Sequence, residues 1–296
     1  MDRLRALETF IAVADGGGFA AAGRSLGMSP PSVTRLVSEF EGEIGATLFH
    51  RTTRQVTLTE AGETMLVEAK RILSAYDSAV DVARGAFAAP KGLLRVTAPN
   101  LFGCFYVTPL LRAYLDRYPD ASVEAVYLDR VVNIVEEGFD LAVRIGDLPD
   151  STLMATRVGA VRRVVCGAPG YFGRRGAPLA PEELSEHDVI NARAVTPTPT
   201  WRFAGGRSVE VRPRLTVSSV SAAIDGAKEG WGLTRVLSYQ IASELDAGAL
   251  KTVLSEFEPE PLPVHVLHAG GVRPPAKVCA FLALARETLR ANPHLN

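Results

Sequence analysis

The fold of the N-terminal part is decided by one stretch, Phe19–Gly62, which reads FAAAGRSLGMSPPSVTRLVSEFEGEIGATLFHRTTRQVTLTEAG. It predicts two helices separated by a turn at Gly27. Ser29 can cap the second helix, and Pro30 and Pro31 fall in its first turn, where a missing N–H group costs nothing. A short helix, a glycine-containing turn and a capped helix are typical of a helix-turn-helix.

The second predicted helix has an apolar face and a polar face. Apolar side chains recur at helical spacing at Val33, Leu36, Val37, Phe40 and Ile44. Small polar groups on the opposite face would let the helix lie deep in the major groove of DNA, with Arg35 reaching a guanine edge or a phosphate. The candidate DNA-contacting residues of this helix are Ser29, Pro31, Ser32, Thr34, Arg35 and Ser38. The spacing alone also fits a plain three-helix packing unit with a solvated face.

The segment Leu48–Leu58 reads as a β-hairpin with cations and hydroxyls at its tip. A wing of this kind places cations where they can meet phosphates or enter a minor groove. The candidate contacts are Arg51, Thr52 and Arg54.

Three linked motifs resemble the winged helix of LysR-type transcriptional regulators. They are FAAAGRSLGMS at 19–29, LFHR at 48–51 and LTEAG at 58–62. The resemblance implies sequence-specific binding to double-stranded DNA. The chain departs from the family pattern at Gly18 and Ala20, where serine is common, and at Pro30, where glutamine is common. Loss of the glutamine removes a possible contact with a base or phosphate, so the operator sequence is not predicted.

A long helix is expected next, with Thr59 as its cap. Its apolar residues follow an a/d heptad pattern over three repeats: Leu66, Ala69, Leu73, Tyr76, Val80, Ala83 and Phe87. The stripe favours self-association through Leu66, Leu73, Tyr76, Val80 and Phe87, and packing of the helix on its own domain is the alternative. The resemblance implies a linker helix that forms a homodimer or homotetramer and presents two winged helices to two half-sites of an operator.

Beyond the break at Pro90-Lys91-Gly92, short apolar runs alternate with helical segments, as in an α/β domain with parallel strands. Strands are expected at 93–98, 122–128, 140–146, 161–168, 188–192, 215–218, 231–236 and 264–267. Helices are expected after Asn100, through Ile134 and Val135, before Gly230, and at the C-terminal end. Two such halves with a crossing chain predict a two-lobed domain. It resembles the effector-binding domain of the same family, which is similar to type 2 periplasmic binding proteins.

The expected fold is therefore an N-terminal winged helix-turn-helix (1–58), a linker and dimerisation helix (59–89) and a two-lobed α/β regulatory domain (90–296). Ligands bind open α/β sheets at the carboxyl ends of the strands. The candidate effector-binding residues there are Pro99, Asn100, Leu101, Arg144, Thr196, Thr198, Ser218 and Ser219.

The chemistry of three of these residues favours a small anionic effector. Asn100 and Ser219 open helices whose N–H groups could hold a carboxylate, and Arg144 could pair with one. Simple helix capping is the alternative for the first two, and a salt bridge to Asp140 or Asp147 is the alternative for Arg144. The hydroxyl-rich segment 196–200 would suit a neutral polar ligand equally well.

Composition excludes several classes of protein. The net charge of the 296 residues is −1, and residues 1–88 carry nine basic and eleven acidic side chains, so DNA binding must rest on local placement. No apolar run is long enough to span a membrane, and the three cysteines match no metal spacing. We find no catalytic constellation and expect no cofactor, no metal and no enzymatic activity. The expectation is a cytoplasmic transcriptional regulator; the rival is a cytoplasmic small-molecule-binding or enzymatic α/β protein with a helical appendage.

Overall fold

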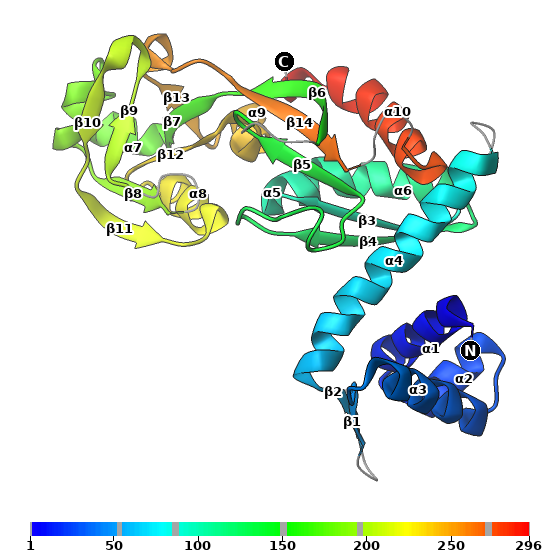
Figure 1. Ribbon diagram of the computed structural model, residues 1–296. Coiled ribbons are helices and arrows are strands. Elements are labelled where there is room, and N and C mark those ends of the chain that lie inside the picture. Colours follow the sequence, from blue (N-terminus) through cyan, green and yellow to red (C-terminus); the bar gives the residue numbers. More distant parts are fainter. Residues whose placement is uncertain are drawn as a thin grey trace.

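The computed structural model describes residues 2–51, 55–84, 89–148, 153–193, 198–269 and 274–295. Figure 1 shows a small helical domain at the N-terminal end, the long helix α4, and a larger domain in which two sheets lie side by side. Among the described residues, no helix combines the length and the apolarity that a membrane span requires.

The N-terminal domain consists of three helices and a two-stranded hairpin. These are α1 (Arg3–Gly16), α2 (Phe19–Leu26), α3 (Pro30–Ile44), β1 (Phe49–Arg51) and β2 (Val56–Leu58), the two strands pairing antiparallel. As predicted, Gly27 makes the turn with a left-handed φ of 64°, and the side chain of Ser29 accepts a hydrogen bond from the N–H of Ser32 to cap α3. The helix-turn-helix and its wing are thereby confirmed.

Three aromatic rings hold these elements together. The ring of Phe10 on α1 lies 6.0 Å from that of Phe40 on α3 and 5.3 Å from that of Phe49 on β1. All three side chains are buried. Burial of an aromatic side chain stabilises a fold by about 1.5–3 kcal/mol, so this cluster ties the wing to the helices.

Helix α4 (Glu60–Arg84) starts where the wing ends. The Thr59 hydroxyl accepts a hydrogen bond of 2.9 Å from the N–H of Gly62, which confirms the predicted cap. The helix crosses the wing backbone so closely that a Cβ at Gly62 would lie 2.1 Å from the carbonyl oxygen of Leu48. Glycine is therefore required in the LTEAG motif by the approach of two backbones.

The apolar stripe of α4 is divided between two environments. Three of its members pack on the core of the chain's own N-terminal domain: Leu66, Ala69 and Leu73. Tyr76 is 50% exposed, Ile72 beside it is also exposed, and Val80 is half-buried. Phe87 lies outside the described residues. Packing on the chain's own domain therefore accounts for the first half of the stripe and leaves Tyr76 as its exposed member.

The first lobe of the larger domain is a five-stranded sheet in the order β4-β3-β5-β14-β6. Its strands are β3 (Gly92–Ala98), β4 (Ala121–Tyr127), β5 (Leu141–Ile145), β6 (Met154–Val161) and β14 (Leu262–His268). Its helices are α5 (Asn100–Phe102), a π-helical turn (Gly103–Val107), α6 (Thr108–Arg117) and α10 (Ala276–Arg290). The core of this lobe includes the fully buried Leu94, Phe102, Tyr114 and Phe281.

The second lobe is a five-stranded sheet in the order β11-β8-β12-β7-β13. Its strands are β7 (Arg163–Gly167), β8 (Val189–Ala192), β11 (Pro213–Val217), β12 (Leu233–Leu237) and β13 (Lys251–Val253). The other elements are α7 (Pro169–Arg175), α8 (Val220–Lys228), α9 (Ala242–Asp246) and a hairpin of β9 (Thr200–Arg202) and β10 (Ser208–Glu210). Short 3₁₀ turns occupy Pro181–Glu186, Ala204–Gly206, Ser238–Ile241, Ser255–Phe257 and Pro293–Leu295.

The chain enters the second lobe between β6 and β7 and returns between β13 and β14, so the two-lobed architecture with a crossing chain is confirmed (Figure 1). Three expectations need correction. Strands β6, β9, β10 and β13 were not predicted. Each sheet is mixed, because β14 runs antiparallel to its neighbours in the first lobe and β7 in the second. The helix expected through Ile134 and Val135 is a single turn, since Gly138 with its φ of 69° ends it at once.

Candidate DNA-binding surface and effector cleft

The polar face of α3 lies on the surface of the N-terminal domain. Ser29, Pro31, Arg35 and Ser38 are exposed, whereas Ser32 and Thr34 are half-buried. The hydroxyls of Ser29 and Ser32 lie 2.8 Å apart, and the hydroxyl of Thr34 donates to the carbonyl of Pro30, so these groups serve the helix itself. The side chain of Arg35 is 77% exposed, and among the described residues its ion-pair partner is Glu39, 3.8 Å away. Arg35 is therefore the group on this face that is most free to reach DNA.

Arg51 was expected at the tip of the wing as a contact to DNA, but in the structure its side chain is bound within the N-terminal domain. Its guanidinium donates to the hydroxyl of Ser38, pairs with the carboxylate of Glu41 and lies over the ring of Phe19 at 4.9 Å. Glu41 also accepts hydrogen bonds of 2.8 and 3.2 Å from the N–H groups of Leu48 and Phe49. Arg51 thus fastens the wing to α3. Thr52 and Arg54 lie outside the described residues.

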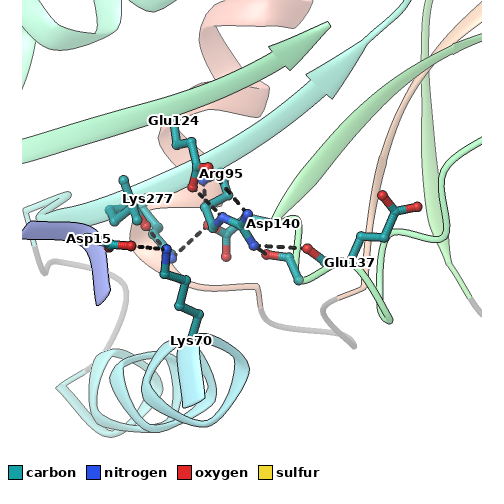
Figure 2. A network of polar contacts seen from close by, with 9 residues as sticks. Asp15, Lys70, Arg95, Glu124, Glu137, Asp140 and Lys277 are labelled. Carbon is teal, nitrogen blue, oxygen red and sulfur yellow. Dashed lines mark hydrogen bonds and ion pairs between the residues drawn. The ribbon is translucent and has the colours of Figure 1, made fainter. Parts of the chain in front are cut away.

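A network of polar contacts lies where α4 passes the first lobe, and Figure 2 shows it from close by. On the α4 side, Lys70 pairs with Asp15 of α1 at 2.9 Å. On the lobe side, the amine of Lys277 on α10 lies 2.8 Å from the carboxylate of Asp140, and this pair is almost fully buried. The amine also donates to the carbonyl of Leu93. Asp140 is therefore paired with Lys277. The salt bridge between Asp140 and Arg144, one of the alternatives predicted for Arg144, does not form among the described residues.

Arg95 is the centre of the same network (Figure 2). Its guanidinium pairs with Glu124 at 2.6 Å and donates to the carbonyls of Glu137 and Gly138 at 2.9 and 2.8 Å. The hydrogen bond from Arg95 holds the pKa of Glu124 below its usual range, and the charge of Lys70 acts in the same direction. Every described charge in this network has a partner of opposite sign or a carbonyl acceptor.

A cavity of about 240 Å³ lies between the lobes, at the carboxyl ends of β3, β4, β5 and β11. The first lobe contributes Pro99, Asp129, Arg130 and Arg144, and the second contributes Arg163, Val220, Tyr239 and Gln240. This is the edge of the sheets at which the sequence predicted a ligand.

The predicted effector residues are distributed unevenly around this cavity. Pro99 and Arg144 line it, and Leu101 packs against the cores of both lobes instead. Ser218 and Thr198 are exposed and lie outside its lining, and Thr196 is outside the described residues. Of the seven predicted residues that the structure describes, two line the cavity, Pro99 and Arg144.

At each of the two helix N-termini expected to hold a carboxylate, one N–H group is already bonded within the chain. The N–H of Asn100 donates to the carboxylate of Asp129 at 2.9 Å, and the hydroxyl of Ser219 accepts from the N–H of Ala222 at 3.4 Å. Ser219 thus caps α8, the alternative that the sequence left open, whereas Asn100 is the first residue of α5 and its side chain does not cap the helix. Anion binding by the remaining N–H groups at Asn100 and Ser219 stays a prediction.

Arg144 lines the cleft, as predicted. Its guanidinium donates to the carbonyl of Val132 at 2.8 Å, and burial lowers its pKa from the ordinary value. Among the residues that the structure describes, it pairs with neither Asp140 nor Asp147. A partly buried cation on a cleft wall is suited to an anionic ligand.

Four lining residues of the cleft were not predicted: Arg130, Arg163, Tyr239 and Gln240. No local pattern marks them: Arg163 begins a strand, and Tyr239 and Gln240 lie in a short turn after β12. Arg130 follows β4 of the first lobe, and the other three meet that lobe because the crossing chain brings the two sheets together.

The comparisons with known proteins agree with this geometry. The family model described as the LysR substrate binding domain matches residues 88–290, and that of the bacterial regulatory helix-turn-helix protein, lysR family, matches residues 4–63. The chain is 30% identical to the probable HTH-type transcriptional regulator LtrA of Klebsiella pneumoniae over 96% of this chain and 94% of the relative. It is 30% identical to the HTH-type transcriptional regulator PtxR of Pseudomonas aeruginosa over 98% of this chain and 94% of the relative.

A solved structure shares the whole arrangement. CrgA, a LysR-type transcriptional regulator from Neisseria meningitidis, matches with a TM-score of 0.63 and 27% identity, over 97% of this chain and 99% of that one. A helix-turn-helix with an exposed polar face and a two-lobed domain with a cleft are thus joined in the same order as in these regulators. The chain belongs to the LysR family of transcriptional regulators, with a helix-turn-helix DNA-binding domain and an effector-binding regulatory domain.

Proposed function

We propose that the protein binds an operator with two half-sites as a homodimer or homotetramer and responds to a small anionic molecule held between the lobes of its regulatory domain. The observation that carries the proposal is the cleft at the carboxyl ends of the strands, with the partly buried Arg144 on its wall. The functional division is the one expected from the sequence, at 1–58, 59–89 and 90–296.

DNA recognition is assigned to the exposed face of α3, with Arg35 as the base-reading or phosphate-reading group. The surface that approaches the major groove of DNA is formed by Ser29, Pro31, Ser32, Thr34 and Ser38. In the wing, Thr52 and Arg54 are assigned to contacts with the DNA phosphate backbone. Arg51 positions the wing through Glu41 and Ser38, which supports an indirect part in binding.

Dimerisation is assigned to α4. Leu66 and Leu73 support it indirectly, because they hold the helix on its own domain, and the exposed Tyr76 and Ile72 offer apolar surface to a second copy. Val80 and Phe87 continue the predicted stripe toward the regulatory domain.

The effector is proposed to act by changing how the two lobes close. The ion pairs of Arg95 and Lys277 hold the edge of the first lobe that lies beside α4, and the charge of Lys70 on α4 helps to lower the pKa of Glu124 at that edge (Figure 2). This proximity supports a change of lobe position altering the orientation of the linker helices. A coupling free energy of about 1–3 kcal/mol is enough to change occupancy of an operator several-fold to a hundredfold. We propose that the protein acts in the cytoplasm as a regulator and not as an enzyme.

The test is a gel-retardation experiment with DNA that flanks the gene. Wild-type protein should retard this DNA in preference to an unrelated fragment of the same length, and Arg35→Ala should lose about 1–3 kcal/mol of specific binding free energy. Arg112→Ala, on an exposed face of α6 in the regulatory domain, is the matched control. Equal retardation of both fragments by the wild type would refute sequence-specific recognition.

A further inference from the structure

The cleft between the lobes carries two arginines whose charge is not balanced by an ion pair, one on each lobe. Arg144 and Arg163 both line it, and among the described residues neither forms an ion pair. Asp147 is close enough to Arg163 to favour its charged form but is not in contact with it. Each wall of the cleft therefore contains an arginine that has no carboxylate partner among the described residues.

The other charged side chains in the described lining of the cleft already have hydrogen-bond partners within the chain. Arg130 is bound by both carboxylate oxygens of Glu137, at 2.9 and 2.7 Å. Asp129, the acidic group of the described lining, accepts the N–H of Asn100 at 2.9 Å. Arg144 and Arg163 are therefore the cations that remain available to a ligand.

A third arginine adds positive charge behind Arg163. The pairing of Leu237 with Arg163 and of Arg235 with Val165 puts Arg163 and Arg235 on the same face of the second sheet. Arg235 is only 4% exposed, with its guanidinium over the ring of Phe203 at 5.0 Å. It donates to the carbonyl of Arg202, which is not an anion.

Two buried donors in this region are without a hydrogen-bond partner among the described residues: Nε of Arg235 and the indole N–H of Trp201. Burial, and then the neighbouring Arg163, lower the pKa of Arg235 to about 10. Its guanidinium is still charged at neutral pH. A buried charge without a counter-ion is costly in free energy, and Arg235, which is not itself a lining residue, adds positive charge behind Arg163 of the cleft wall.

We propose that the effector is a small dicarboxylate, with one carboxylate bound by Arg144 of the first lobe and the other by Arg163 of the second, where Arg235 adds positive charge. The proposal rests on the cleft being the effector site and names the class of molecule that binds there. The planar guanidinium fork matches a carboxylate with two parallel hydrogen bonds. The cavity of about 240 Å³ is smaller than the 300–1,000 Å³ typical of drug-sized ligands, so it suits a small acid and not a nucleotide.

The test uses isothermal titration calorimetry on the full-length protein with defined probes. The probes are the dicarboxylates from malonate to pimelate and the three phthalate isomers, each beside the monocarboxylate of the same carbon skeleton, at constant pH and ionic strength. At least one dicarboxylate should bind at least tenfold more tightly than its monocarboxylate. The series of chain lengths then reports the spacing between the two guanidinium groups.

The variants Arg163→Gln and Arg144→Gln should each weaken that binding about 10- to 100-fold, the range expected for loss of a charge-assisted hydrogen bond. Arg163→Lys should lose less, and Arg112→Gln, on the exposed face of α6, should bind like the wild type. Circular dichroism and DNA retardation show whether each variant is folded.

Three results would overturn the proposal: no dicarboxylate of the series binds, a monocarboxylate binds as tightly as its dicarboxylate, or folded Arg163→Gln binds unchanged. If the wild type still retards its operator in these cases, the proposed regulator stands and only the dicarboxylate assignment fails. Loss of specific DNA retardation by the wild type would instead refute the proposed function.

Discussion

The regulatory domain contains two groups of buried charge that are constructed differently. At the edge of the first lobe beside α4, Lys277 is paired with Asp140 and Arg95 with Glu124. In the second lobe, Arg235 is equally well buried, but its partners in the described part of the chain are a backbone carbonyl and aromatic rings, and no carboxylate pairs with it. A paired group of charges can fix the relative position of strands and helices, whereas an unpaired group is left to interact with a ligand. The variants below separate these two roles.

The largest effect is expected for Lys277→Met. This change leaves the buried carboxylate of Asp140 without its ammonium partner, so the free energy of unfolding should fall by about 3–5 kcal/mol. Urea unfolding of the full-length protein, followed by circular dichroism, measures the loss. The double variant Lys277→Met with Asp140→Asn should recover part of it, because no unpaired charge remains. A single variant as stable as the wild type would show that the pair does not hold the lobe.

A smaller loss is expected for Arg95→Met. The guanidinium of Arg95 donates to the carbonyls of Glu137 and Gly138 and pairs with Glu124, so its removal should destabilise the first lobe by about 1–3 kcal/mol. Amide hydrogen exchange should also rise in the segment 130–139. Arg117→Met, at the exposed C-terminal end of α6, serves as the control in the same experiment.

Arg235→Met, unlike Lys277→Met, should leave the free energy of unfolding almost unchanged. Methionine removes a buried charge that lacks a counter-ion, and this gain offsets the lost hydrogen bond to the carbonyl of Arg202. The stability of the ligand-free protein should therefore change by less than about 1 kcal/mol in either direction. The same urea measurement tests this. A loss comparable to that of Lys277→Met would mean that Arg235 is a structural group, and the contrast between the two lobes would disappear.

The smallest effect concerns pH and Glu124. Its pKa is lower in the folded protein than in the unfolded chain, so the folded state binds fewer protons and is favoured at pH above the unfolded pKa. This contribution is lost as the pH falls through the lowered folded value, and because the side chain is 40% exposed, solvent screens it. Between pH 6 and pH 3, Glu124→Gln should lose less stability than the wild type. Parallel pH profiles of the two proteins would contradict this assignment.

The local elements of the N-terminal domain were predictable because their causes lie within a few residues of one another. The Ser29 cap, the left-handed Gly27 and the apolar spacing of α3 are each decided by neighbours along the chain. In the regulatory domain, the same kind of local signal predicted most strands, and it failed at the single turn through Ile134, where Gly138 ends the helix.

What the sequence by itself determined is the order of the elements, the winged helix-turn-helix, the two α/β lobes and the cation Arg144 at the cleft. Tertiary structure alone decided which charges are paired. Lys277 lies 137 residues from Asp140 along the chain, and Arg163 reaches the cleft only because the chain crosses between the lobes. A cap depends on backbone groups next to it, but an ion pair depends on where two distant elements pack, and no local pattern encodes that distance.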